Sequence, residues 1–512
     1  MTVVLAPEPV PAGLLEAFWA YDRALLANDL DALAALFAPG DDTLRADASG
    51  ILVGHHAITA FRSGRTAVPT RSVARVHVRP MAPGVVTTIA ETLGDAGTRG
   101  LQTQVWRCVE GRWRVCAAHV TQPGPGRAFD PSIWRVVGSP LVAGAPSGPL
   151  SGCSVAVKDL FAVRGHPIGA GNPTWLAGAA VSPEHAAVVA AVVEAGADVA
   201  GIARTDEFAY SLAGTNAHHG TPPNPAAPDR ISGGSSSGPA SAVAAGQVDI
   251  GLGTDTGGSV RVPASYQGLF GLRTTHGAVP RVGMLPLAPS FDTVGWLTRD
   301  AAMLERVTTT LLATATRAPL RRGVVVPAVL DRVDATVRAA FDEAVAGLAL
   351  DRVDTVSLAP EVLAAWGAAF RTVQGHEAWG VDGAWVAAHP GALGPDVASR
   401  FATAAEVSDE EAAAARVVVA EARATLRAIL EPGVALLLPA TSSPAPSRAA
   451  EPGDPVIEAA RAATLGLTCL AGLAGAPAVS MPLMTVDGAP VGLSAIAAPG
   501  ADLDLVRWAS PS

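Results

Sequence analysis

The serine-rich stretch 232-SGGSSSG-238 combines small polar residues with the most flexible residue type. It holds four serines and three glycines, and residues 239–246 continue it as the apolar run PASAVAAG. A flexible linker would stay polar, whereas this run is typical of a buried helix. Hydroxyl groups on a glycine-rich turn before a helix favour a site where the backbone comes close to a substrate.

Two further segments place polar side chains next to residues that could alter their reactivity. One is 155-VAVKDLF-161, in which apolar residues surround Lys158, and the other is 251-GLGTDTGGSVRVPASYQGLFGLRTTHGAVP-280. Together with residues 232–238, they resemble the amidase signature family, whose hydrolases use a Ser–cis-Ser–Lys triad. The resemblance is strong over residues 152–298. It continues in two later segments that look like the family's closing strands, 465-LGLTCLAGLAGAPAVSMPL-483 and 490-PVGLSAIA-497.

The resemblance implies a role for each candidate residue. Ser259 would be the nucleophile, Ser235 would follow a cis peptide bond and relay the proton, and Lys158 would be the base. Ser235 and Ser259 stand 24 positions apart, as in the family. The oxyanion hole would be formed by four successive backbone N–H groups, those of Thr256, Gly257, Gly258 and Ser259.

Three neighbouring residues are expected to support this group. Ser236 would contribute hydrogen bonds. Asp255 and Arg261 flank the nucleophile and would form a structural ion pair, with direct substrate contact as the alternative. The family commonly has GGSSGG where this chain has GGSSSG. Ser237 thus replaces a glycine, and we expect the change to be tolerated because Ser235 is unaffected.

Elementary chemistry agrees with these residue types. A serine hydroxyl is a poor nucleophile and needs an adjacent base. Lysine can be that base only when neutral; its reference pKa is about 10.4, and burial can lower it by several units. A serine between lysine and nucleophile can relay the proton, because its hydroxyl both donates and accepts. Gly257 and Gly258 let successive N–H groups converge on one oxyanion, and losing such a donor costs roughly 10²–10³ in rate.

Two shorter motifs overlap the same residues. The run 234-GSSSG-238 matches G-x-S-x-G, the nucleophile turn of α/β-hydrolases, which would make Ser236 the nucleophile with a downstream histidine and acid. Serine-rich segments meet so short a motif by chance. The run GTDTGGS alone is compatible with a phosphate-binding turn, but no GK[ST] follows it. The longer, three-part signature is favoured over both.

The first part of the chain has a different pattern. Residues 14–38 predict two helices, with Asn28 or Asp29 capping the second, and a third short helix follows Gly54. A hairpin turn is predicted at residues 109–113. Four segments alternate in the manner of strands: 72–80, 84–94, 101–109 and 112–120. Helices followed by an antiparallel sheet form an α+β unit.

This order of elements resembles the NTF2-like cone fold. More narrowly, LLEAFWAYDRALLANDLDALAALF, GHHAITAFRSGR and RWRVCAAHVT resemble AtzH-like domains, over nearly all of residues 12–121. Arg62, Arg65, Trp106 and His119 could line the pocket of such a cone. The alternative, which we favour, is that these four are ordinary surface and core residues.

We therefore expect three parts: an AtzH-like, NTF2-like domain at residues 1–122, a Pro/Gly-rich linker or extended crossover at 123–150, and an amidase signature domain at 151–512. The linker is predicted from segments such as 138-GSPLVAGAPSGPLSG-152. Beyond it, β-like runs alternate with Ala-rich helical runs. That alternation predicts an α/β fold with one large mixed sheet flanked by helices.

The composition excludes several classes of protein. Apolar residues make up 49% of the chain and charged residues 16%, which is not the composition of a disordered protein. A net charge of −10 argues against nucleic acid or an anionic membrane as the partner. The N-terminus lacks a basic region, and no stretch of eighteen uncharged apolar residues occurs. The four cysteines form no cluster, so we expect free thiols in the cytoplasm.

These observations predict a cytoplasmic serine amidohydrolase that needs no metal or cofactor and cleaves a small amide or ureido substrate, such as carboxybiuret. Arg371, in the segment 370-FRTVQGHEAWGVDGAW-385, could bind a substrate carboxylate or could equally face solvent. Three alternatives remain: a glutamine-using amidotransferase subunit, a non-catalytic ligand-binding or assembly protein, and an activity located in the first domain. A homodimer is also left open.

Overall fold

The computed structural model describes residues 3–6, 9–47, 50–63, 71–94, 99–121, 129–312 and 318–510. The chain divides into two compact units, residues 1–128 and residues 129–512. Each unit has its own sheet and its own hydrophobic core.

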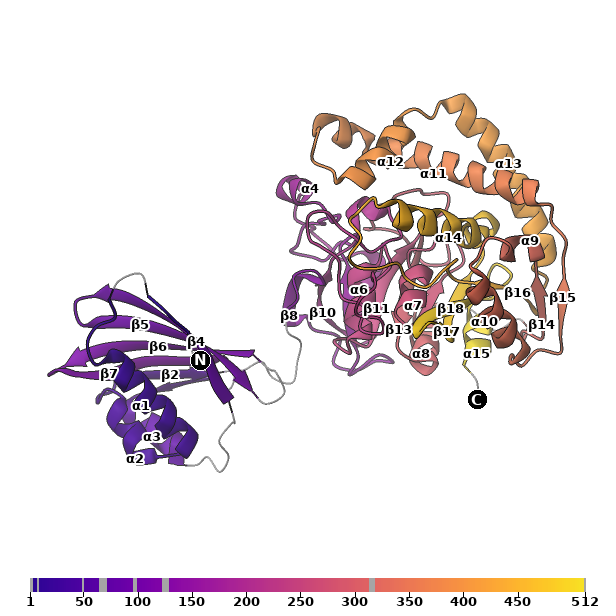
Figure 1. Cartoon of the computed structure of the whole chain (residues 1–512). Coiled ribbons are helices and arrows are strands. Elements are labelled where there is room, and N and C mark those ends of the chain that lie inside the picture. Colours follow the sequence, from indigo (N-terminus) through magenta and orange to yellow (C-terminus); the bar gives the residue numbers. More distant parts are fainter. Residues whose placement is uncertain are drawn as a thin grey trace. The chain divides into compact units, whose positions relative to one another are not determined.

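Unit 1 is a seven-stranded sheet with three helices packed on one face (Figure 1). The four long central strands are antiparallel, whereas β1 pairs parallel with β4 and β2 pairs parallel with β7. The helices are α1 (Leu14–Ala27), α2 (Leu30–Leu36) and α3 (His55–Ser63). In sheet order the strands are β1 (Val3–Leu5), β4 (Arg71–Ala82), β5 (Val85–Gly94), β6 (Arg99–Val109), β7 (Arg112–Thr121), β2 (Leu44–Asp47) and β3 (Gly50–Val53).

The periodicity of unit 1 explains its layers. Leu14, Phe18 and Tyr21 recur at helical spacing and are buried, so one face of α1 packs on the sheet. The predicted helices and the four long strands are confirmed, and Asp29 caps α2 by accepting the Ala32 N–H at 3.0 Å. The three short strands β1, β2 and β3 were not predicted. They have only three or four residues each, too few for a clear alternation.

The residues proposed for a cone pocket have different environments. Trp106 is fully buried and donates to Thr88 Oγ1 at 3.0 Å, which makes it part of the core. Arg62 is buried and donates to the Tyr21 hydroxyl at 3.2 Å, whereas His119 is exposed. Arg65 lies outside the described residues.

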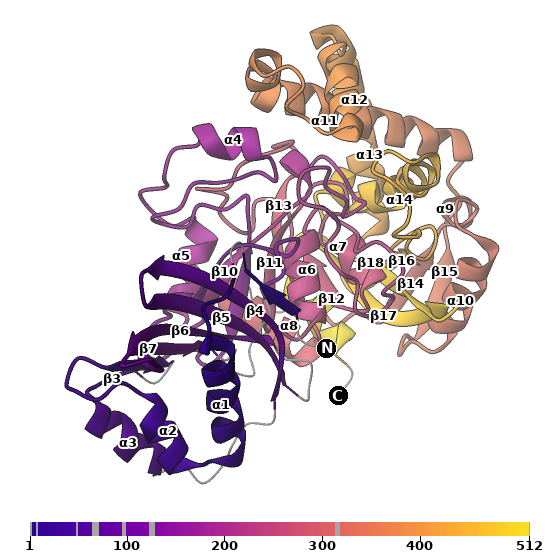
Figure 2. The same cartoon turned by 60° about the vertical axis from the view of Figure 1, so that its left-hand side comes forward.

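Unit 2 is built on one large sheet of eleven strands with helices on both faces (Figures 1 and 2). The sheet mixes parallel pairs, such as β9 with β11, and antiparallel pairs, such as β11 with β13. The predicted fold class is therefore confirmed. In sheet order the strands are β15 (Arg352–Thr355), β14 (Arg322–Val325), β16 (Val434–Pro439), β18 (Ala489–Ile496), β17 (Ala478–Val486), β12 (Phe270–Arg273), β13 (Thr293–Thr298), β11 (Ile250–Asp255), β9 (Ser154–Lys158), β10 (Asp198–Ala203) and β8 (Trp134–Val142).

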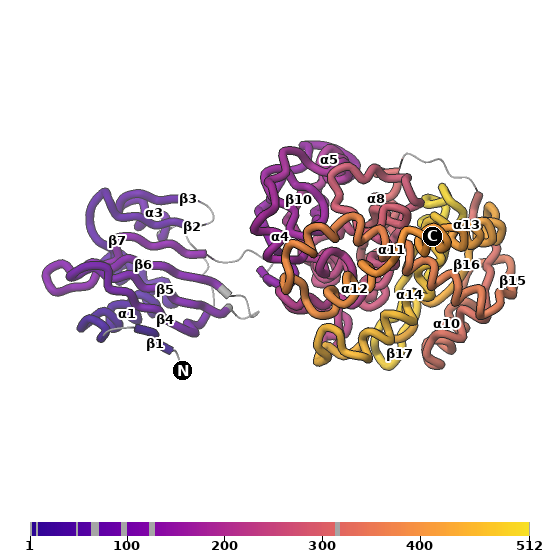
Figure 3. The backbone as a smooth tube through the Cα atoms, turned by 90° about the horizontal axis from the view of Figure 1, so that it is seen from above, coloured from indigo at the N-terminus to yellow at the C-terminus, as the bar shows by residue number. Residues whose placement is uncertain are grey.

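Helices α11, α12 and α13 form a layer over α14, as Figures 1 and 3 show from two directions. A short 3-10 helix spans Glu207–Ala209. The α-helices of unit 2 are α4 (Pro173–Gly178), α5 (Ala187–Glu194), α6 (Ser237–Ala244), α7 (Arg261–Tyr266), α8 (Ala301–Leu311), α9 (Pro327–Leu330), α10 (Ala335–Ala346), α11 (Pro360–Ala388), α12 (Pro395–Ala405), α13 (Asp409–Ile429), α14 (Pro455–Ala474) and α15 (Asp502–Ala509).

The structure differs from expectation in the segment 123–150. Its residues 134–142 form β8, which pairs antiparallel with β10 at the edge of the large sheet. Trp134 is fully buried and its indole N–H donates to Gln247 Oε1 at 2.7 Å. Gly, Pro and Ser residues dominate the second half of this segment, and an edge strand tolerates them because one side makes no ladder hydrogen bonds.

One described helix, α14, is long and apolar enough to cross a membrane by length and composition. More than half of its apolar window is buried inside unit 2, where it packs against α11 and α13. Buried core helices commonly have this composition, and α14 fits that case.

A buried ion triad ties four elements of unit 2 together. Asp255, at the end of β11, accepts two bonds from Arg261 of α7, at 2.8 and 3.0 Å, and one from Arg273 of β12 at 2.9 Å. Arg261 also donates to the Thr468 carbonyl of α14 at 2.9 Å. Burial alone would raise the pKa of Asp255, but the two guanidinium groups outweigh it and hold the pKa well below its usual range.

Removing the central charge of this triad should destabilise unit 2 strongly. We expect Asp255→Asn to lower the free energy of unfolding by about 3–5 kcal/mol, because two fully buried guanidinium groups lose their carboxylate. The control is Asp354→Asn, which removes an exposed partner of Arg322 and Arg352 and should cost less than about 1 kcal/mol. Urea unfolding would measure both, and equal shifts would contradict this account.

Candidate active site

The candidate residues meet where two neighbouring strands end. Lys158 is the last residue of β9, and Asp255 is the last residue of the parallel strand β11. Ser236 lies directly before α6, and Ser259 lies two residues before α7. Because parallel strands deliver their carboxyl ends to one edge, segments far apart in sequence converge there.

Lys158 is fully buried and its Nζ is held by three hydroxyl groups. It donates to Ser235 Oγ at 2.9 Å, Ser236 Oγ at 3.1 Å and Thr254 Oγ1 at 2.8 Å. An ammonium group has three N–H donors, so these hydroxyls satisfy all of them. Lys158 is also the one lysine among the 36 lysines and arginines of the chain.

The environment of Lys158 favours its neutral form. Burial lowers the pKa of Lys158 to about 7, against the opposing attraction of Asp206, Asp255 and Asp292. None of its three direct partners carries a charge. A neutral amine is therefore accessible near pH 7, and it can accept a proton from one of these hydroxyls.

The turn that carries Ser235 is held by buried polar groups. The Gly234–Ser235 peptide bond is cis, as the resemblance implied. The Ser235 carbonyl accepts from the Thr205 hydroxyl at 2.9 Å and from the Asp206 N–H at 3.2 Å. A Cβ at position 234 would lie 2.2 Å from Asp206 Oδ2, so only glycine fits there.

Ser237, which replaces a glycine of the family pattern, is part of the same network. Its hydroxyl donates to Asp206 Oδ1 at 2.9 Å, and the Gly214 N–H donates to the other carboxylate oxygen at 2.9 Å. Burial raises the pKa of Asp206, whereas these hydrogen bonds and Lys158 lower it. The substitution therefore adds a partner for a buried acid.

Ser259 faces a narrow cavity of about 20 Å³, which Gly257, Tyr210 and Leu465 also line. Within the described residues its hydroxyl makes no hydrogen bond with a protein group, while its carbonyl accepts the Ser236 N–H at 3.1 Å. The loops carrying the two serines are thus joined through the backbone, and the Ser259 hydroxyl is free to meet a ligand.

The four N–H groups expected to form the oxyanion hole are not equivalent. The Gly258 N–H was expected to be free for the oxyanion. It instead donates to the Asp255 carboxylate, at 3.0 Å from Oδ1, so it is not available for the oxyanion. The N–H groups of Thr256, Gly257 and Ser259 have no protein acceptor among the described residues. Three donors are therefore left at this turn for a developing negative charge.

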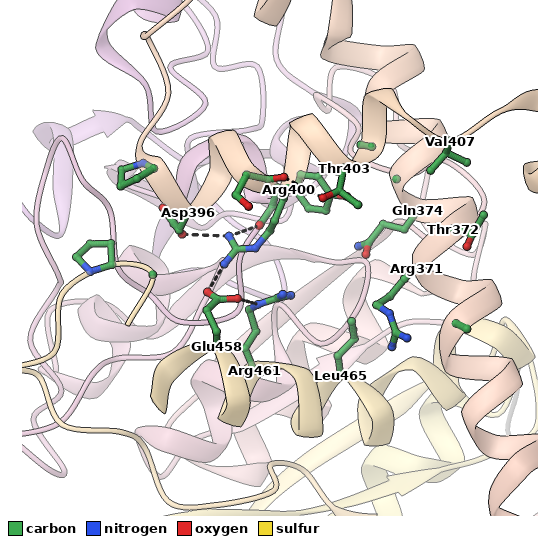
Figure 4. Close-up of a pocket in the computed structure, with 18 residues that line it drawn as sticks. Arg371, Thr372, Gln374, Asp396, Arg400, Thr403, Val407, Glu458, Arg461 and Leu465 are labelled. Carbon is green, nitrogen blue, oxygen red and sulfur yellow. Dashed lines mark hydrogen bonds and ion pairs between the residues drawn. The ribbon is translucent and has the colours of Figure 1, made fainter. Parts of the chain in front are cut away.

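A second and larger cavity, of about 650 Å³, is shown in Figure 4 and shares lining residues with the narrow one. Both cavities are lined by the same four residues: Tyr210, Gln374, Arg461 and Leu465. Arg371 lines the larger cavity from α11, on an exposed position, and does not line the cavity of Ser259. Among the described residues no cluster of three or more histidine, cysteine, aspartate or glutamate side chains is arranged to hold a metal ion.

Several residues of this site were not identified from the sequence. Thr254 and Asp206 contact the candidate residues directly, and Arg461 lines both cavities. Asp206 and Arg461 stand 29 and 202 positions from Ser235 and Ser259, and no motif joins them to these serines. The sequence does carry one signal for Lys158. It is the single lysine of an arginine-rich chain, which indicates a position that arginine cannot fill.

Comparison with known proteins identifies both units. A family profile described as Amidase matches residues 139–506, and one described as AtzH-like matches residues 4–124. The first match covers most of the catalytic fold, including every candidate site residue.

Curated relatives include enzymes and a translocon protein. "Amidase 1" of Arabidopsis thaliana is 37% identical over 73% of this chain and 95% of its own length. "Translocon at the outer membrane of chloroplasts 64" of Pisum sativum is 33% identical over 69% of this chain and 64% of its own length. A glutamyl-tRNA(Gln) amidotransferase subunit of Akkermansia muciniphila is 44% identical over 31% of this chain and 34% of its own length. Cellular location therefore differs among the relatives.

Solved structures agree with these matches. A crystal structure of an amidase superposes with a TM-score of 0.64 at 31% identity, covering 70% of this chain and 84% of that one. A chain from the inhibitor-bound structure of a vestigial protein complex, one said to reveal the evolutionary origins of an s-triazine catabolic enzyme, has a TM-score of 0.65 at 28% identity, covering 71% of this chain and 84% of that one. The chain belongs to the amidase signature family, hydrolases of carbon–nitrogen bonds other than peptide bonds, and carries an AtzH-like domain at its N-terminus.

Proposed function

We propose that this enzyme hydrolyses a small amide or ureido substrate through an acyl-enzyme, with Ser259 as nucleophile, Ser235 as proton relay and Lys158 as base. The observation that carries the proposal is the fully buried Lys158, whose Nζ lies 2.9 Å from Ser235 Oγ, on the turn whose Ser236 N–H donates to the Ser259 carbonyl. Nucleophile activation by an adjacent base in a dry site is the recurring way to make serine reactive.

The first half of the reaction forms the acyl-enzyme. Neutral Lys158 takes the proton of Ser235 Oγ, which takes the proton of Ser259 Oγ as that oxygen attacks the substrate carbonyl carbon. The oxyanion is stabilised by the N–H groups of Thr256, Gly257 and Ser259, which have no other acceptor in the described residues. Breaking the C–N bond returns the proton to the leaving nitrogen along the same serine relay.

The second half releases the acid. A water molecule gives its proton to the relay, attacks the ester carbon and frees the carboxylic acid from Ser259. Lys158 returns to its neutral state when the proton passes back to the Ser259 oxygen. The three hydroxyl partners of Lys158 suit this cycle, because they accept from the ammonium form and Ser235 donates to the neutral form.

The size of the cavities supports a small substrate. The narrow cavity holds the reacting group, and the cavity of about 650 Å³ holds the remainder of the molecule. Arg371 on its wall is a proposed contact for a substrate carboxylate. The proposals of a small-molecule substrate, a cytoplasmic location and no nucleic-acid partner rest on the sequence alone.

Replacing Ser259 tests the chemical core of the proposal. We expect Ser259→Ala to lower kcat by roughly a thousandfold or more, because no acyl-enzyme can form, and Lys158→Ala to have nearly the same effect. Ammonia release would be measured by a coupled assay. The matched control is Ser510→Ala, which makes the same chemical change after α15 and should leave the rate unchanged. Full activity of either site variant would refute the assignment.

The pH profile tests the state of Lys158. Since the base must be neutral and its pKa is lowered to about 7, kcat/KM should rise roughly tenfold per pH unit below pH 6.5 and level off above about pH 8. Lysine labelled with ¹⁵N at Nζ would give a single NMR signal, because the chain has one lysine, and its titration should have the same midpoint.

The control for this profile is Asp382→Asn. Burial raises the pKa of Asp382 to about 7, with Asp292 adding to the effect, so this acid titrates in the same range. The profile should keep its inflection in Asp382→Asn. An Nζ signal that titrates near pH 10 would show that Lys158 is a permanent cation and would exclude it as the base.

A substrate panel separates the remaining alternatives. We expect ammonia release from biuret, carboxybiuret, allophanate or simple amides, dependent on Ser259. Glutamine hydrolysis in preference to these would favour the amidotransferase alternative, a function that the similarity to such a subunit over 31% of the chain keeps open. Activity that persists when residues 1–128 are removed would assign the chemistry to unit 2, and loss of it with unit 2 still folded would contradict that assignment.

A further inference from the structure

The narrow and the large cavity meet at a neck made by Tyr210, Gln374, Arg461 and Leu465, the residues that line both. Figure 4 shows Gln374 and Arg371 on α11, opposite Arg461 and Leu465 on α14. A substrate that reaches from Ser259 into the large cavity must pass these side chains.

At this neck the guanidinium of Arg461 is only partly paired. Its Nε donates to Glu458 Oε2 at 2.8 Å, but among the described residues its two Nη atoms have no acceptor. The side chain is about four-fifths buried, so water replaces these missing partners poorly. A guanidinium fixed at Nε presents both Nη groups as a fork, the geometry that matches a carboxylate.

The two acids of the cavity are already paired: Asp396 with Arg400, and Glu458 with both Arg400 and Arg461. Arg400 Nη1 donates to Asp396 Oδ2 at 3.0 Å and to the Tyr210 carbonyl at 2.9 Å, and its Nη2 donates to Glu458 Oε1. Three arginines and two acids line the cavity, which leaves it with an excess of positive charge. This excess lies on Arg371 and Arg461, whose terminal nitrogens have no acidic partner in the described part of the chain.

The rest of the neck is shaped to present a substrate to Arg461. Tyr210 follows Phe208 and Ala209, two non-glycine residues with φ of 49° and 57°, a left-handed backbone that turns Tyr210 toward α11. The Tyr210 ring packs against Phe401 with centroids 5.2 Å apart. The Gln374 amide makes no hydrogen bond within the described residues and adds a free polar group beside the cation.

We propose that Arg461 is a specificity-determining residue that binds an anionic group of the substrate, and that the preferred substrates are therefore amides bearing a carboxylate. The inference rests on the proposed function, since it concerns the same cavity. Arg461 is favoured over Arg371 because it lines the cavity of Ser259 as well as the large one, whereas Arg371 is exposed on the outer wall. A carboxylate near the scissile bond would therefore lie on the side of Arg461, which lines the narrow cavity, whereas Arg371 does not.

Paired substrates test this proposal. The monoamides of malonate, succinate and glutarate would be compared with their methyl-ketone isosteres 3-oxobutanamide, 4-oxopentanamide and 5-oxohexanamide, which replace the carboxylate by a neutral group of equal size. The measured quantity is the ratio of kcat/KM for each pair. The wild type should favour at least one monoamide, and Arg461→Gln should lower that ratio about 10- to 100-fold, the effect of losing hydrogen bonds to a charged group.

Matched variants separate recognition from structure. Arg461→Lys keeps the charge but loses the planar fork and should keep only part of the preference. Arg371→Gln removes the competing contact on the outer wall and should lower the ratio less than Arg461→Gln does. The ratio within each pair is the readout, because a general loss of folding or activity in a variant lowers both rates of a pair together. A ratio near one in the wild type, a ratio unchanged in Arg461→Gln, or a loss found only in Arg371→Gln would overturn the inference.

The two proposals fail in different ways. Hydrolysis of either member of a pair that persists in Ser259→Ala would refute the proposed function. Hydrolysis that depends on Ser259 without any preference for the carboxylate would refute only the role of Arg461. Calorimetry of succinamate with Ser259→Ala and with Ser259→Ala/Arg461→Gln gives a readout without turnover, and equal affinities would also overturn the inference.

Discussion

The buried amine of Lys158 is the group on which the arrangement of the catalytic unit depends. A charged amine without partners is costly in the interior, so its three N–H donors need three acceptors. They come from three positions on two segments, Ser235 and Ser236 on the turn before α6 and Thr254 on β11. Strand β11 must therefore lie beside β9, and the turn must fold back over both strand ends. Gly253 permits this approach, because a Cβ there would lie 2.6 Å from Ser236 Oγ.

The choice of hydroxyl partners has a consequence for chemistry. A carboxylate in direct contact would hold Lys158 in its charged form, whereas hydroxyl groups accommodate both protonation states. The nearby acids are engaged elsewhere: Asp255 binds two arginines, and Asp206 accepts from Gly214 and Ser237. Arginine could not replace the lysine, because its guanidinium does not lose a proton in proteins. The Asp255 ion pairs and the titratable amine of Lys158 thus lie close together, each with its own partners.

The sequence predicted the helices, strands and site segments that local patterns encode. Strand and helix periodicity identified α1, α2, α3 and the four long strands of unit 1, and the long signature identified the segments that meet at Lys158. Contacts that the signature does not specify were missed. Thr254 and Asp206 join the site through sheet order and chain reversal, which no local pattern encodes. The Gly258 N–H was expected to be free, and only the structure shows that the Asp255 carboxylate, three residues away, accepts it.

In the proposed mechanism, the two cavities divide the chemistry from the recognition of the substrate. Lys158, Ser235 and Ser259 lie on strand ends and tight turns whose buried hydrogen bonds allow little movement. The large cavity is lined chiefly by α11, α12 and α14, which begin a hundred residues or more after Ser259 and hold its arginines and acids. Side chains on these helices can change without disturbing a hydrogen bond of Lys158. Arg461, Gln374 and Leu465 line both cavities, so changes at these three positions would act closest to the proposed nucleophile while leaving the hydrogen bonds of Lys158 as they are.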